Sequence, residues 1–173
     1  MVQRTFIKNQ SVWNEWRSDD YTIIKRCIDH DFRAWKGSRF VKSKADLIDL
    51  ENIITQNFEF LKAEHISQIS QSNFPSSTLN QMTIYAKKAK FIDKNVNQAC
   101  LDRLFIAANV ESGEEPAGGD NPDGALVRYE FLEFLARIAQ EKYQKTGIVN
   151  TCAEAFQMLI ERNLLPISEV EKW

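Results

Sequence analysis

The residues best suited to chemistry lie in a polar stretch of the chain, residues 109–130. This stretch is rich in acids, glycine and proline, a composition that interrupts helices and predicts a loop. Near its end stand Asp123, Gly124 and, six residues after the glycine, Glu130. Carboxylate and carbonyl oxygens are the ligands that calcium prefers, so the pattern predicts a cation site.

Each residue at the end of this loop has a type that suits such a site. Gly124 can adopt a backbone angle that a Cβ atom would penalise, so the chain can turn sharply there. Leu126 is apolar and would pin the loop to the core. Glu130 would lie in the first turn of the next helix, where a negative charge is favourable.

The pattern from Asp123 to Glu130 resembles the closing half of an EF-hand calcium loop. The resemblance implies a helix–loop–helix unit whose ligands are Asp123, the Ala125 carbonyl and Glu130. The loop's start allows two alignments. Counting back from Glu130 adds Asn121 as a ligand. Phe105 instead indicates Asn109 as the first ligand, with a loop longer than the usual length of about 12 residues.

EF-hands usually occur in pairs, so the resemblance implies a degenerate first hand before residue 92. There Phe74 would take the place of Leu126, and Thr78 that of the ligand glutamate, so we expect no ion in the first hand. Two hands packed face to face would leave an apolar groove. A helix or tail of another protein would lie in that groove.

The periodicity of apolar residues predicts an all-α fold with EF-hand-like helix–loop–helix pairs and an extra N-terminal helical segment. The expected helices span residues 21–35, 43–65, 77–91, 95–108, 128–143 and 151–163. Three parts are expected: an N-terminal helical extension with a basic, aromatic turn (1–42), the paired EF-hand-like domain (43–145) and a C-terminal helical segment (146–173). The last part could begin a further hand.

The composition limits the possible classes of protein. Apolar residues make up 43% of the 173 residues, enough for a packed core, and the formal net charge of −2 argues against a protein devoted to polyanions. Three widely spaced cysteines indicate reduced thiols in an intracellular, cytoplasmic protein. No apolar run is long enough to span a membrane, the N-terminus lacks the apolar core of a secretion signal, and the chain could be a segment of a longer protein.

Other possible sites are weaker. Residues 33–44 carry five basic and two aromatic side chains, a mixture that could bind phosphate, although a solvated turn with inward-facing aromatic rings explains it more simply. Cys27 and His30 have the spacing of a metal-ligand pair, but no second cysteine pair accompanies them. No local pattern indicates a nucleophile with its base, and we expect no enzyme activity.

The sequence therefore predicts an EF-hand-like protein-interaction module that holds a partner's helix or tail, with calcium acting through the 109–130 loop. The partner-binding residues stay unassigned. One alternative is a calcium-independent structural component of a cytoskeletal or ciliary assembly, and another is a regulatory domain of a larger enzyme. Binding to nucleic acid through residues 33–44 ranks last, and no membrane partner is expected.

Overall fold

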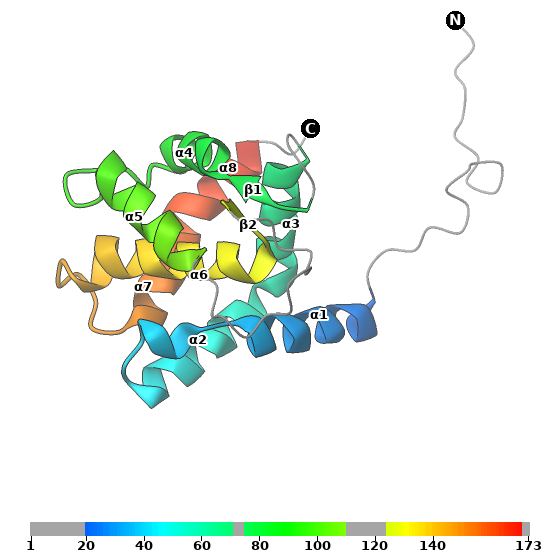
Figure 1. Ribbon diagram of the computed structural model, residues 1–173. Helices are drawn as coiled ribbons and strands as arrows, with labels where there is room; N and C mark the ends of the chain where they lie inside the picture. The colour runs from blue at the N-terminus through cyan, green and yellow to red at the C-terminus, as the bar shows by residue number, and fades with distance from the viewer. Residues whose placement is uncertain (1–19, 71–74, 110–123, 171–173) are drawn as a thin grey trace, which may run out of the picture.

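The computed structural model describes residues 20–70, 75–109 and 124–170, and these are mostly helical (Figure 1). The predicted all-α class is confirmed. The helices in chain order are α1 (Tyr21–Ala34), α2 (Lys44–Gln56), α3 (Phe58–Ile69), α4 (Leu79–Lys88), α5 (Gln98–Ala108), α6 (Arg128–Ala139), α7 (Cys152–Leu159) and α8 (Leu165–Val170). A 3₁₀ turn (Gly37–Arg39) follows α1, and π-helical turns follow α6 (Gln140–Gln144) and α7 (Ile160–Leu164).

Polar side chains cap the starts of several helices. The Ser43 hydroxyl accepts the Asp46 N–H at 3.3 Å and the Thr151 hydroxyl accepts the Glu154 N–H at 3.1 Å, which confirms the predicted starts of α2 and α7. The predicted start of the helix at residue 95 is too early, because the cap is Asn97 and α5 begins at Gln98.

Asp93 closes the turn that precedes this cap. Its carboxylate accepts the N–H groups of Asn95 and Val96 and also pairs with Lys142, which follows α6. These local hydrogen bonds hold the chain in a turn, so the helix begins later than its apolar pattern suggests.

The single helix expected over residues 43–65 is two helices. The chain leaves helical geometry at Asn57, whose φ and ψ angles are −106° and 13°, and the Asn57 side-chain amide donates to the Ile53 carbonyl at 2.9 Å. Asparagine favours such side-chain bonds to the backbone, which compete with a continuous helix. The break lets α2 pack against α7 while α3 packs against α6.

Two helix–loop–helix units occupy the middle of the chain. The first is α3, strand β1 (Ser77–Thr78) and α4, and the second is α5, strand β2 (Ala125–Leu126) and α6. The two strands pair antiparallel, with Ser77 opposite Leu126 and Thr78 opposite Ala125. This bridge holds the exits of the two loops side by side (Figure 1).

Helix α6 forms the centre of the core. Nine of its twelve residues are buried, and its Phe131 lies 5.2 Å from the His65 ring of α3 and 5.9 Å from the Tyr85 ring of α4. Phe134, one turn later, meets Phe105 of α5 edge to face. The second unit's helices therefore pack together and also hold the first unit.

The C-terminal helices pack back onto this core. Helix α7 contacts α2 and α6, and Phe156 and Leu164 are fully buried. Asn163, after α7, donates to the Ala89 carbonyl at the end of α4 and accepts from the Tyr143 hydroxyl. Residues from all three expected parts of the chain, 1–42, 43–145 and 146–173, thus contribute to one apolar cluster.

Helix α2 also caps α7. Asp46 is buried, and its two carboxylate oxygens accept the N–H groups of Cys152 and Ala153, each at 2.9 Å. A carboxylate at a helix N-terminus is favoured both by these free N–H groups and by the helix dipole. Asp46 therefore fixes the position of α7 against α2, although it lies 106 and 107 residues before its two partners in the sequence.

Candidate functional site

The end of the 109–130 loop has the geometry expected from its residue types. Gly124 has a φ angle of +85°, in the left-handed region that glycine tolerates, as predicted. Leu126 is fully buried, so it does pin the loop to the core. The predicted ligands Asn121 and Asp123 lie outside the described residues.

Asn109 closes the two ends of the loop on each other. With its amide oriented to satisfy both neighbours, the Asn109 side chain accepts the Gly124 N–H at 2.9 Å and donates to the Ala125 carbonyl at 3.0 Å. The structure thus brings together two predicted ligands, Asn109 and Ala125, but bonds them to each other. The Ala125 carbonyl already has a hydrogen-bond donor within the chain.

Glu130 is buried and also engaged. Its carboxylate accepts the Val127 N–H at 3.0 Å, three residues before it, so it helps to satisfy the free amide groups at the start of α6. Within the described residues, no group of three or more histidine, cysteine, aspartate or glutamate side chains could hold a metal ion. The described end of the loop is therefore bonded internally.

The first unit repeats this arrangement with different residues. Because Ser77 pairs with Leu126, Gln81 of α4 corresponds to Glu130, and its side chain likewise accepts the N–H three residues earlier, at 2.9 Å from Thr78. The prediction that Thr78 takes the glutamate's place is wrong by three residues, since Thr78 pairs with Ala125 in the bridge. The predicted role of Phe74 falls outside the described residues.

A buried ion pair that the sequence analysis did not find joins α1 to α6. The Arg128 guanidinium donates to both oxygens of Asp31, at 2.6 and 2.9 Å, and Asp31 is 1% exposed. Arg128 also lies over the Phe58 ring. Cys27 and His30 line a hollow of about 480 Å³ together with Arg128, whose fixed guanidinium charge is unfavourable to a bound cation.

The basic residues of segment 33–44 surround aromatic rings that face inward, as the simpler interpretation predicted. Trp35 is buried and packs edge to face against Phe40, and Arg137 of α6 covers the Phe40 ring at 4.6 Å. The rings are thus used in packing and are not presented to solvent as a stacking surface for bases.

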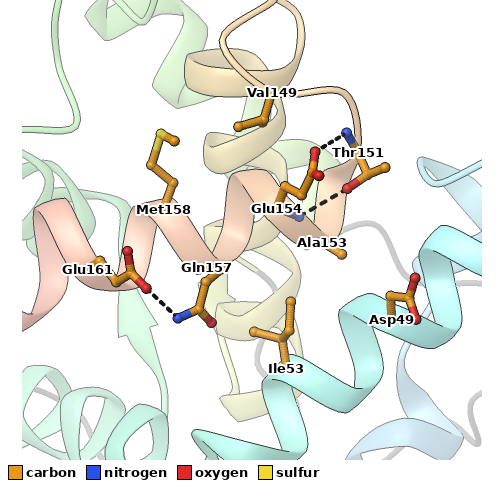
Figure 2. A pocket seen from close by; sticks show the side chains of 9 residues that line it. All are labelled: Asp49, Ile53, Val149, Thr151, Ala153, Glu154, Gln157, Met158 and Glu161. Atoms are coloured by element: carbon orange, nitrogen blue, oxygen red, sulfur yellow. Dashed lines mark hydrogen bonds between the residues drawn. The ribbon is translucent and has the colours of Figure 1, made fainter.

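A groove between α2 and α7 is a surface hollow with mixed chemistry. It has a volume of about 550 Å³, and Figure 2 shows Asp49 and Ile53 on α2 across from the side chains of α7. The full lining consists of Asp49, Ile53, Val149, Thr151, Ala153, Glu154, Gln157, Met158 and Glu161. Sequence reasoning missed this groove because it depends on the Asn57 break and on the Asp46 cap.

The groove has an apolar floor and an acidic rim. Ile53, Val149 and Met158 are half-buried, whereas the three acids Asp49, Glu154 and Glu161 are exposed. Glu154 accepts the N–H groups of Asn150 and Thr151, which lower its pKa, so it is ionised at neutral pH. Among the residues that the structure describes, no lysine or arginine lines the groove.

Comparison of the chain with protein-family models, with curated proteins and with solved structures gives no significant match. None of the described helices has the length and apolar content needed to cross a membrane.

Proposed function

We propose that this chain is a protein-interaction module in which two EF-hand-like helix–loop–helix units form a fixed frame that holds a segment of another protein. The side of the frame where a partner helix was expected is occupied by the chain itself. Helix α7 packs along α6, and Asn163 after α7 reaches the end of α4. The partner's contact surface is therefore on the outside of the frame.

The observation that carries this proposal is the internal bonding of the second loop. The Ala125 carbonyl is bonded to Asn109, and the Glu130 carboxylate accepts the Val127 N–H. Both groups contribute to packing without an ion, and the β1–β2 bridge joins the loops directly. This favours the calcium-independent form of the module.

Two of the side chains that could act as nucleophile or base, Cys152 and His65, are buried, which favours binding over catalysis at their positions. Burial raises the pKa of the Cys152 thiol to about 12, so the reactive thiolate is absent at neutral pH. Burial lowers the pKa of His65 to about 4, and its ring packs against Phe131 in the core. Neither side chain lies where a substrate could reach it.

A calcium-regulated module is the second candidate. Gly124 has the left-handed turn that a calcium loop needs, and Glu130 stands in the first turn of α6, where it could exchange its backbone bond for an ion. Calcium would then shift α6, the helix at the centre of the core.

Capture of a partner from extracts of the source cell, with calcium and with a chelator, tests the proposal. We expect the same partner under both conditions, and no heat when calcium is titrated into the folded chain up to millimolar concentration. Capture only with calcium, together with binding heat, would establish the calcium-regulated form instead. Failure to retain any specific partner under either condition would refute the interaction module.

A further inference from the structure

We infer that the α2–α7 groove binds an amphipathic helix of a partner protein that carries lysine or arginine residues around an apolar side chain. The inference rests on the proposed function and adds to it the place and the chemistry of contact.

The floor of the groove suits an apolar side chain. Ile53 from α2 and Met158 from α7 are only half-buried, and Val149 approaches from the preceding loop (Figure 2). Ala153, a small residue, also lines the groove. Covering this surface would remove apolar area from water, the main favourable term in association. Methionine adapts its shape to different partners more easily than branched residues do.

The charges of the rim determine which partner fits. Asp49 lies on α2, Glu154 and Glu161 project from the helical segment after residue 151, and within the described part of the chain none of the three makes an ion pair. A basic helix would supply the missing cations, whereas an acidic one would be repelled. Complementary charges of this kind mainly fix partner choice and speed association.

The spacing of the acids indicates the partner's pattern. Glu154 and Glu161 are separated by two helical turns, about 10 Å along the axis, and Asp49 lies on α2 near the Ala153 end of the groove. A partner helix with basic residues at positions i and i+7 and a leucine at i+3 or i+4 would place both charges at the rim and the leucine on the floor.

The test uses a synthetic helical peptide of leucine and lysine with this spacing, titrated into the full chain while backbone amide resonances are recorded. We expect the shifts to cluster on α2 and α7. The double variant Asp49→Lys with Glu161→Lys should weaken binding at least tenfold. A matched reversal of two exposed acids outside the groove, Asp29→Lys with Glu59→Lys, should leave it unchanged. Glu154 is not altered because it helps to cap α7.

Three results would overturn the inference: equal binding of a peptide with glutamate in place of lysine, shifts centred on another face, or no effect of the groove reversal in a variant with unchanged helicity and melting temperature. Absence of any peptide binding would overturn it as well. The natural partner could still be captured from extract in each of these cases, so the proposed function would stand. If the peptide bound the groove but no partner were captured from extract, the proposed function would be rejected and the groove's binding preference would stand.

Discussion

Replacement of Asp46 by alanine should destabilise the chain far more than its position on a surface helix suggests. Asp46 lies in the first turn of α2, but both its oxygens bond to the N-terminus of α7, to Cys152 and Ala153. Alanine would leave two buried backbone N–H groups without an acceptor. The contact between α2 and α7, which forms the proposed groove, would lose its polar anchor.

The magnitude follows from the number of bonds lost. A hydrogen bond to a charged group contributes about 1.5–3 kcal/mol, so losing two should cost about 3 kcal/mol once the relief of a buried charge is subtracted. The variant Asp46→Asn keeps one acceptor oxygen and should cost about half as much. For a chain of this size, 3 kcal/mol corresponds to a fall in melting temperature of about 6–12 °C.

Urea denaturation followed by circular dichroism measures these differences. The matched control is Asp49→Ala, one turn later on α2 and exposed, which should stay within about 0.5 kcal/mol of the parent chain. If the Asp46→Ala variant were as stable as this control, the cap between α2 and α7 would not contribute as the structure indicates.

Three further predictions concern the core and the loop. Burial lowers the pKa of His65 to about 4, so as the pH falls below 6.5 a proton binds His65 in the unfolded chain before it binds in the folded one. The free energy of unfolding should therefore be highest above pH 6.5 and about 2 kcal/mol lower at pH 5. In denaturation at pH 7.5 and 5, His65→Leu should remove this loss; a variant that loses as much stability at pH 5 as the parent chain would contradict it. Arg128→Met removes the guanidinium partner of buried Asp31, leaving its carboxylate only the His30 ring at 3.2 Å, and should cost about 3 kcal/mol, whereas adding Asp31→Leu should restore part of it; a double variant as unstable as the sum of the singles would refute the pairing. Asn109→Ala removes two loop-closing bonds and should speed amide exchange in β2, measured by NMR; unchanged exchange would argue against this closure.

The parts of the fold that depend on local chemistry could be predicted from the sequence. Ser43 and Thr151 mark helix starts by their side-chain chemistry, and Gly124 marks a turn that needs a positive φ angle. The apolar stripes of α5 and α6 follow from their spacing. Each of these features depends on residues within about one helical turn of each other.

The features that could not be predicted depend on contacts between distant parts of the chain. Asparagine also occurs within helices, so Asn57 alone does not predict a break. The break can be explained only from the structure, in which Phe58, the first residue of α3, is buried in the core. Asp46 resembles an ordinary first-turn acid, and nothing local links it to residue 152. The register of the β1–β2 bridge depends on both loops together. One loop's sequence alone therefore aligns Thr78 with Glu130, whereas the bridge aligns Gln81 with it.

The most direct test of the account places a photoreactive residue in the groove of the full chain, as Gln157→p-benzoylphenylalanine, and irradiates it in extract of the source cell with a calcium chelator present. The account predicts a crosslinked partner from this position and none from the same residue placed at Asp29 on α1. A partner crosslinked from α1 alone, or from the groove only when calcium is supplied, would contradict it.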